Sequence, residues 1–285
     1  MKLFEVFRFE LYYQLSRWIT WLYFVIFLGI TFAMVMSFVD NVRDGDYLLN
    51  APLVVGAIAS IASLLGLLVI AAVAGDSATH DMQERMEPLL YTSPLSKFAY
   101  LGGRFLGAFV IGAVVLSAVP IGLIIAFVFP GVDAALFGPF ELISYSNAYL
   151  LVALPNVFVT TAILFSVALL SRHVLVSFLV GAFLFMGSMM SKEVMGDHMG
   201  MWTLAKLLDL SGFTVFGELK ASMSTLEINS RQVGLDKWLL LNRALWLAVA
   251  SGMLWFSHFR FRFAHYVSSS WWKAVFKRKV VAPDL

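Results

Sequence analysis

The sequence predicts an all-α integral membrane protein with six transmembrane helices. The 285 residues are 60% hydrophobic and 13% charged, with a mean hydropathy of +0.85, whereas soluble domains are roughly 45–50% apolar and about 25% charged. Six apolar stretches reach or approach the roughly 20 residues that a helix needs to cross the hydrocarbon core. None of them shows the alternation of a barrel strand, so their backbone must be hydrogen-bonded within helices.

The charged residues predict the number and direction of the crossings. We expect spans near residues 21–39, 51–74, 101–129, 149–170, 174–190 and 239–259, within a transmembrane domain at 21–259. Most of the 20 lysines and arginines fall on the side of the two termini, and nearly all the others lie in the long segment after span five. The positive-inside rule therefore predicts that both termini are cytoplasmic.

Residues 1–20 predict an amphipathic helix that lies in the membrane interface. At helical spacing, one face carries large apolar side chains and the charged residues fall elsewhere. Glu5 and Glu10 argue against a signal peptide. The alternative is a cytosolic extension of span one. The apolar face comprises Leu3, Phe4, Phe7, Leu11, Leu15 and Trp18.

No ionisable residue lies in the middle of a predicted span. Arg243 comes closest, and we expect its side chain to extend to the headgroups. A carrier driven by an ion gradient needs titratable or ion-binding groups at mid-membrane, so the energy source is expected outside the bilayer. The polar candidates for a transport pathway are Asn156, Thr160 and Thr161, beside Pro155, and Ser117, beside Pro120.

Small residues predict close helix packing. Gly103 and Gly107 form a GxxxG pattern at the start of span three, and Gly56, Ser60, Ser63 and Gly66 give span two a similar face. Such residues let helix backbones approach closely. We expect them to pack helices within one chain, and an interface between subunits is the alternative.

The cytoplasmic segment at 75–100 predicts a helix, a break and a second helix. Asp76 is a candidate N-cap for a short helix, Pro88 ends it, and Ser93 with Pro94 begins the next. The apolar groups Leu89, Leu90 and Tyr91 lie at the break. Apolar residues displayed on this side favour a partner surface, and a loop resting on lipid is the alternative.

The sequence offers no catalytic motif. It lacks the phosphate-binding pattern G-x-x-x-x-G-K-[ST], the pattern G-x-S-x-G, the zinc motif H-E-x-x-H and any cysteine. We therefore expect no enzyme activity in this chain and no cofactor bound to it. If ATP drives this protein, another chain must bind it.

The segment at 191–238 predicts short, broken helices on the outer side. It begins with a group of methionines, of which Met195 and Met199 flank His198. Thioether and imidazole ligands suit Cu(I), but methionine also fills irregular gaps in packing. We favour packing, so no metal site is predicted and these three residues are weak candidates only.

The string RMEPLLYTSPLSKFAYLGGRFLGAF, from Arg85 to Phe109, resembles the segment between spans two and three in permeases of the type-2 ABC exporter superfamily. More narrowly, FRFELYYQLSR at 7–17, LLNRALWL at 240–247 and RFRF at 260–263 are similar to the permease portion of bacterial proteins that fuse such a permease to a zinc aminopeptidase. The peptidase motif is absent here. The basic tail at 260–285 is either a true terminus or the start of a linker.

The resemblance implies a permease subunit of an ATP-driven exporter in a bacterial cytoplasmic (inner) membrane. Residues 1–20 would be the connecting helix, and the break at 75–100 would carry a coupling helix that docks on an ABC ATPase subunit. ATP and Mg would be bound by that partner, and a second permease copy or homologue would complete the transporter. The alternative is a membrane anchor or scaffold, which transports nothing, for a peptidase or a copper-handling partner. The coupling residues would be Glu84, Arg85, Glu87, Leu89, Leu90, Tyr91 and Ser93.

Overall fold

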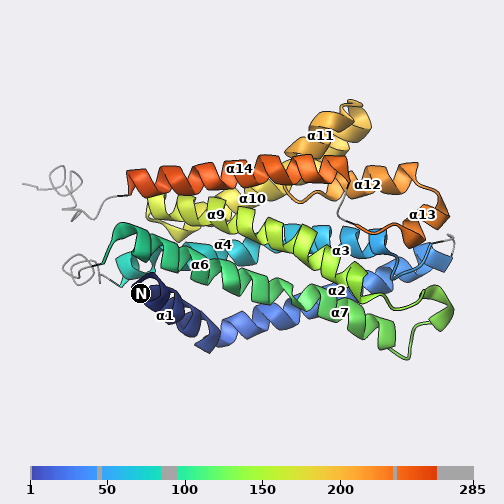
Figure 1. Cartoon of the computed structure of the whole chain (residues 1–285), viewed down its shortest axis with the longest axis horizontal. Helices are drawn as coiled ribbons and strands as arrows, with labels where there is room; N and C mark the ends of the chain where they lie inside the picture. Colours follow the sequence, from blue (N-terminus) through green and yellow to red (C-terminus); the bar gives the residue numbers. More distant parts are fainter. Residues whose placement is uncertain (1, 44–46, 85–94, 234–235, 262–285) are drawn as a thin grey trace, which may run out of the picture.

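The computed structural model describes residues 2–43, 47–84, 95–233 and 236–261, and within these ranges it contains helices and no strands. The helices form an elongated bundle (Figure 1). In chain order they are α1 (Lys2–Ser16), α2 (Trp18–Arg43), α3 (Pro52–Leu65), α4 (Leu67–Gln83), α6 (Lys97–Leu116), α7 (Ala118–Val128), the 3-10 helix η1 (Ala134–Leu136), α8 (Leu142–Asn147), the π-helix η2 (Ala148–Ala153), α9 (Leu154–Ser171), α10 (Val174–Met190), the π-helix η3 (Ser191–His198), α11 (Trp202–Leu208), α12 (Phe213–Ser222), α13 (Thr225–Ser230) and α14 (Lys237–Arg260).

Five helical stretches in the described residues are long and apolar enough to cross a membrane, and a sixth qualifies if one bent pair counts as a single span. The bent pair is α3 and α4, which meet at Gly66 at an angle of 48°. Ser63 lies one turn before the bend, and its hydroxyl donates to the carbonyl of Ala59 at 2.7 Å. A glycine and a serine bonded back to its own helix are recognised causes of such bends.

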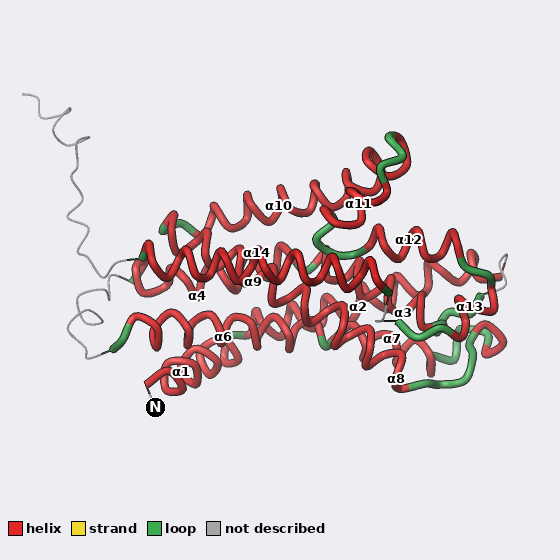
Figure 2. The backbone as a smooth tube through the Cα atoms, turned by 45° about the horizontal axis from the view of Figure 1, so that its top comes forward, coloured by secondary structure: helices red, strands yellow, loops and turns green. Residues whose placement is uncertain are grey.

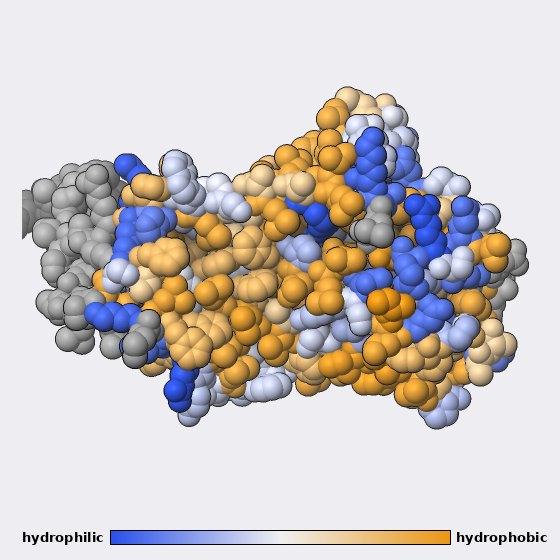
Figure 3. Space-filling view, in the orientation of Figure 1, coloured by the Kyte–Doolittle hydropathy of each residue, from blue (hydrophilic) through white to orange (hydrophobic). Residues whose placement is uncertain are grey.

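The two ends of the bundle are named here by the helices that lie there. The α1 end also holds the end of α4 and the start of α6, and the α13 end holds α12, α13 and η1 (Figure 1). Apolar side chains cover the middle of the surface, and polar ones gather mainly toward the α13 end (Figure 3). Leu175, Leu179 and Phe183 on α10 are each at least 70% exposed. Apolar surface of this extent indicates a membrane protein.

Helix α9 is the centre of the bundle. It packs against α4, α6, α10 and α14, and its side chains Ala162, Leu164 and Phe165 are almost completely buried. Helix α10 leans away from the bundle toward η3 and α11 (Figure 2).

The predicted short helices at 191–238 are present as η3, α11, α12 and α13.

A π-helix precedes the proline of the fourth span. Pro155 has no backbone N–H to donate to the preceding turn, and the six residues of η2 lie directly before α9, where Pro155 is in the first turn. Tyr149 within η2 donates its hydroxyl to the carbonyl of Ala113 on α6, at 2.7 Å. The wide turn thus coincides with a fixed contact between two helices.

The small residues pack helices within the chain, as predicted. A Cβ atom at Gly56 would lie 2.7 Å from the ring of Phe216, and one at Gly112 would lie 2.9 Å from Val157. Both distances are too short for ordinary contact, so a larger residue at either position would force its neighbour to move.

Candidate functional site

A buried charge network joins three helices at the α1 end. Arg104 on α6 forms one ion pair with Glu10 on α1 and another with Asp81 on α4. The three residues are 4%, 0% and 7% exposed, respectively. Tyr100, one turn before Arg104, donates its hydroxyl to the Oδ2 atom of Asp81 at 2.7 Å. We refer to Glu10, Ser77, Asp81, Tyr100 and Arg104 as the charge network.

Helix α1 contributes hydrogen bonds as well as charge. The Oε1 atom of Glu10 accepts from the hydroxyl of Ser77 at 2.5 Å and from the amide of Gln14 at 3.1 Å. Gln14 lies one turn after Glu10 and is also buried. The Gln14 amide also donates to the carboxylate of Asp76 on α4 at 3.3 Å. Arg17 forms an ion pair with the same carboxylate at 2.6 Å. The second half of α1, from Glu10 onward, and Arg17 just after it are therefore bonded to α4.

Two glycines on α6 allow α1 to approach closely enough for these contacts. A Cβ atom at Gly103 would lie 2.7 Å from Val6, and one at Gly107 would overlap the side chain of Glu10. The predicted GxxxG pattern is thus the surface of α6 against which α1 packs. The remaining side of α1 is open and mixes apolar with charged residues, since Phe4 and Phe9 are 64% and 62% exposed and Glu5 and Arg8 are exposed beside them.

The energetics of the charge network favour a rigid connection between the three helices. Two charges taken out of water are costly, and they are tolerated only where their remaining donors and acceptors are satisfied. Here Ser77, Gln14 and Tyr100 satisfy the carboxylates. Removing one partner from such a pair typically costs about 3–5 kcal/mol, so α1, α4 and α6 are expected to move together.

Tyr13 lies at the edge of this region and stays protonated. Its burial raises the pKa of its hydroxyl, the negative charge of Asp76 raises it further, and Arg17 partly opposes both. Its ring packs 4.9 Å from the ring of His80. Beside it, a cavity of about 330 Å³ lies between α1, α2, α4 and α10, with Gln14, Arg17 and Asp76 among its lining residues.

The predicted coupling segment begins where the network ends. Helix α4 ends at Gln83, and Glu84 follows it with an exposed side chain. The other predicted coupling residues, Arg85, Glu87, Leu89, Leu90, Tyr91 and Ser93, lie outside the described residues, as does Pro94.

Two details predicted for this segment are wrong. Asp76 is not an N-cap, because α4 runs through it without a break from Leu67 to Gln83. Its carboxylate pairs with Arg17 instead. Likewise, the helix of the third span begins at Lys97 and not at Pro94, because the hydroxyl of Ser96 accepts from the backbone N–H of Ala99 at 3.2 Å and caps it there.

A second polar cluster, toward the α13 end, contains three of the four predicted pathway residues. Asn156, Thr160 and Thr161 are buried on α9. The Asn156 amide donates to the carbonyl of Ser211 at 3.0 Å, and the Thr160 hydroxyl donates back to the carbonyl of Asn156 at 2.7 Å. The hydroxyl of Thr161 has no hydrogen-bond partner among the described residues.

Ser117, the fourth candidate, does not join this cluster. It lies at the junction of α6 and α7, and its hydroxyl donates to the carbonyl of Val114 in its own helix at 2.7 Å.

The expectation that Arg243 reaches the headgroups is wrong. Arg243 is 6% exposed and points into the bundle, where it donates to the side-chain oxygen of Asn156 and, at 3.4 Å, to the carbonyl of Leu210. Asn156 supplies its oxygen from α9, and Leu210 supplies its carbonyl because the chain at 209–212 turns sharply between α11 and α12. Gly212 adopts a φ of 81° there, and a Cβ atom at this position would meet the Arg243 guanidinium at 2.5 Å.

The turn at 209–212 is fastened from several helices. Ser60 on α3 donates to the carbonyl of Ser211 at 2.8 Å. Asn242 on α14 donates to the carbonyls of Lys206 and Asp209, both at 2.7 Å. The carboxylate of Asp209 accepts from the backbone N–H of Thr214 at 2.6 Å. The polar residues inside this part of the bundle therefore hold a loop in place.

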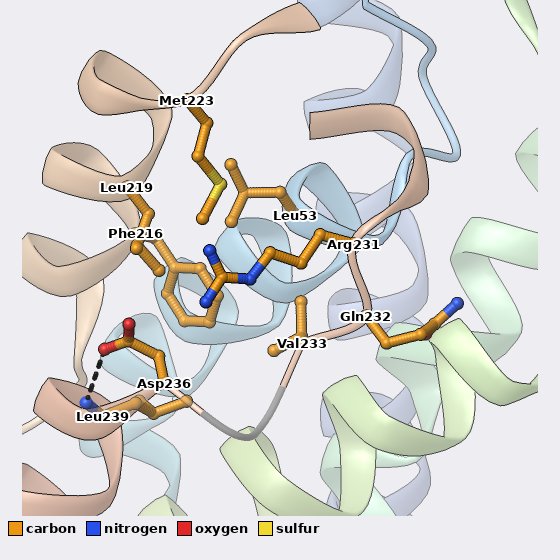
Figure 4. Close-up of a pocket in the computed structure, with 9 residues that line it drawn as sticks. All are labelled: Leu53, Phe216, Leu219, Met223, Arg231, Gln232, Val233, Asp236 and Leu239. Carbon is orange, nitrogen blue, oxygen red and sulfur yellow. Dashed lines mark hydrogen bonds between the residues drawn. The ribbon is translucent and has the colours of Figure 1, made fainter. Parts of the chain in front are cut away.

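A small pocket near α13 is shown in Figure 4. Arg231 points into it from the end of α13, and Asp236 on the other side caps α14 by accepting from the backbone of Trp238 at 2.8 Å and Leu239 at 3.2 Å. Its volume of about 50 Å³ is far below the roughly 300–1,000 Å³ of ligand sites. It is thus a packing gap beside a helix cap.

The three weak metal candidates lie together in sequence at the end of the fifth span. Met195 and His198 belong to η3, and Met199 follows it with an exposed side chain. Within the described ranges, no group of three or more histidine, aspartate or glutamate side chains is placed to hold a metal ion. Metal analysis of the protein purified under reducing conditions would test Cu(I) binding at these residues.

Comparison with known proteins gives no match: no protein-family model fits the sequence, and no curated protein is significantly similar to it. The fold and the site thus define an all-helical membrane protein with a buried charge network at one end.

Proposed function

We propose that this chain is the membrane permease subunit of an ATP-driven ABC transporter and works as an exporter. The observation that supports this most strongly is the charge network. It joins α1 to the last turn of α4 and the second turn of α6, the two helices that flank the segment at 84–96. A push on that segment would be passed to three helices at once.

The rest of the proposal follows from the sequence. The chain has no phosphate-binding motif, so a separate ATPase subunit binds ATP and Mg and docks on the segment at 84–96. The resemblance of residues 85–109 to the coupling region of type-2 exporters favours this arrangement. A second copy or a homologous permease completes the transporter, and the α1 end faces the cytoplasm of a bacterial cell. Rocking of two bundles against each other would alternate access between them.

The composition of the gently solubilised complex tests this proposal. Mass spectrometry of the intact complex should find an ATPase chain bearing a G-x-x-x-x-G-K-[ST] motif in a copy number equal to that of this chain. A complex without such a chain, but with a peptidase or a copper-handling protein, would favour a membrane anchor instead. Flux that follows an ion gradient in the absence of ATP would contradict both.

A further inference from the structure

A groove lies toward the α13 end, between α2, α3, η3 and α12. Its volume is about 480 Å³, within the roughly 300–1,000 Å³ that is typical of ligand sites. One wall is a stripe of apolar side chains on α3, at Leu53, Val54, Ala57 and Ile61. The eight residue steps from Leu53 to Ile61 extend this wall over about 12 Å at 1.5 Å each.

The lining of the groove combines apolar and polar side chains. Phe38, near the end of the apolar stretch of α2, and Ile61 are among the apolar ones. Tyr47 and Trp202 also line it, and amphipathic aromatic residues of this kind gather where hydrocarbon meets headgroups. An occupant that matches this surface has an apolar chain and a polar end.

Two lysines make the lining of the groove positive. The Nζ atom of Lys192, on η3, lies 5.3 Å from the centre of the Phe213 ring. The Nζ atom of Lys220, on α12, lies 4.4 Å from the centre of the Tyr47 ring and donates to its hydroxyl at 3.0 Å. Among the described residues that line the groove, Asp197 alone is acidic. Neither ammonium forms an ion pair with a described carboxylate, so both retain donors for an anion.

Nearby acidic charge does not cancel these lysines. Glu218, which lies between Gly217 and Lys220 on α12, pairs with Lys206 at 2.5 Å. The stem of Lys192 lies against Gly217, one residue earlier. Both lysines thus extend over the same face of α12, along the side of the groove.

We propose that this groove binds one acyl chain of a membrane phospholipid whose anionic phosphate lies beside Lys192 and Lys220. The acyl chain of the lipid lies along the apolar wall formed by α3. The two lysines select an anionic headgroup in the leaflet at the α13 end. Basic pockets between membrane helices recognise lipid headgroups through the same attraction. This lipid site is proposed whether or not the protein is a transporter.

Lipid binding to the intact purified protein tests the groove and the lysines separately. Native mass spectrometry with dioleoyl-phosphatidylglycerol and dioleoyl-phosphatidylcholine should show a preference for the anionic lipid. Lys192→Gln and Lys220→Gln are each expected to weaken binding of phosphatidylglycerol about fivefold, with little effect on phosphatidylcholine. Lys237→Gln is the matched control, because Lys237 is exposed and lies 5.8 Å from a tryptophan ring away from the groove.

Gly217→Leu fills the groove without disturbing the helix. A Cβ atom there would meet only Lys192, at an ordinary 3.4 Å, and leucine favours helix more than glycine does. This variant should lose binding of both lipids, while Gly252→Leu, on the open face of α14, should keep it. Unchanged binding in Gly217→Leu would overturn the proposal. So would an unchanged preference for phosphatidylglycerol in a variant that carries both Lys192→Gln and Lys220→Gln. Displacement of lipid by glycerol phosphate alone would show a free-phosphate site and would also overturn it.

Discussion

The guanidinium of Arg104 on α6 is held between two carboxylates, and the one on Glu10 comes from a helix that precedes the first span. The pair joins residues 94 positions apart in the chain. It makes α1 part of the bundle, although nearly half of that helix is exposed to its surroundings.

Removing the cation from the charge network should destabilise the protein strongly. In Arg104→Met, Glu10 and Asp81 become buried carboxylates without a counter-ion, and we expect the free energy of unfolding to fall by about 3–5 kcal/mol. Thermal unfolding in detergent, followed by tryptophan fluorescence, measures the effect. Arg8→Met is the matched control, because Arg8 lies exposed on α1.

A compensated variant separates charge from shape. Combining Arg104→Met with Glu10→Gln and Asp81→Asn removes all three charges, and most of the lost stability should return. If the triple variant were as unstable as Arg104→Met alone, the destabilisation would come from lost packing and not from uncompensated charge.

The close approach of α1 to α6 should require glycine at 107. Gly107→Ala places a methyl group against the side chain of Glu10, and overpacking of this kind typically costs about 1–3 kcal/mol. Gly252→Ala, whose methyl group would meet nothing within 4 Å, should be neutral or slightly stabilising. The comparison of their unfolding midpoints checks this, and equal midpoints would show that α1 can shift without cost.

Loss of the amide of Asn156 should release the turn between α11 and α12. Asn156→Leu removes a partner of Arg243 and a donor to Ser211, and leaving a buried polar group unpaired costs about 1–3 kcal/mol. Limited proteolysis and hydrogen exchange at 206–214 should become faster. Ser117→Ala, which removes a bond within one helix turn, should leave that exchange unchanged.

The coupling proposal predicts a functional defect without loss of folding. Replacing both Leu89 and Leu90 by Asp should uncouple ATP hydrolysis from transport, because charged groups disfavour an apolar contact with the ATPase. Transport, ATPase activity and the stoichiometry of the complex are measured on the same preparation. Normal stoichiometry with normal turnover would show that the contact lies elsewhere.

The cap of α13 should be sensitive to acid. The pKa of the Glu227 carboxyl is lowered because the backbone N–H and the hydroxyl of Ser224 donate to it. A carboxyl with a depressed pKa stabilises the folded state above its unfolded pKa, and this contribution is lost as the pH falls through the folded pKa. Hydrogen exchange in α13 should therefore be slower in the wild type than in Glu227→Gln at neutral pH. The difference should vanish in strong acid, and a difference that persists there would contradict the assignment.

The sequence predicts the helical class and the six apolar stretches because hydrophobic length is a local property. The bend at Gly66 and the start of α6 at Lys97 depend on which of several serines and glycines interrupts or caps a helix. Near Ser93 and Ser96, two cap candidates lie three residues apart, and the pattern alone does not choose between them.

The charge network could not be predicted from periodicity because its partners come from three helices. Two local signals do exist. Glu10 and Gln14 are polar residues one turn apart on α1, and α6 carries Arg104 between the glycines Gly103 and Gly107. For Arg243, the decisive oxygens belong to the turn at 209–212 and to Asn156, which no local rule connects to it. Its inward orientation is therefore a property of the tertiary structure.

The wide turn of η2 also determines how the fourth span faces its neighbours. A π-turn holds one residue more than an α-turn, so the residues before it are rotated by about 100° relative to an uninterrupted helix. Deleting a single residue from η2 after Tyr149 would restore regular phase and turn Tyr149 and α8 away from their present partners. The length of this segment is thus as constrained as its composition, and insertions or deletions here should be tolerated far less well than substitutions.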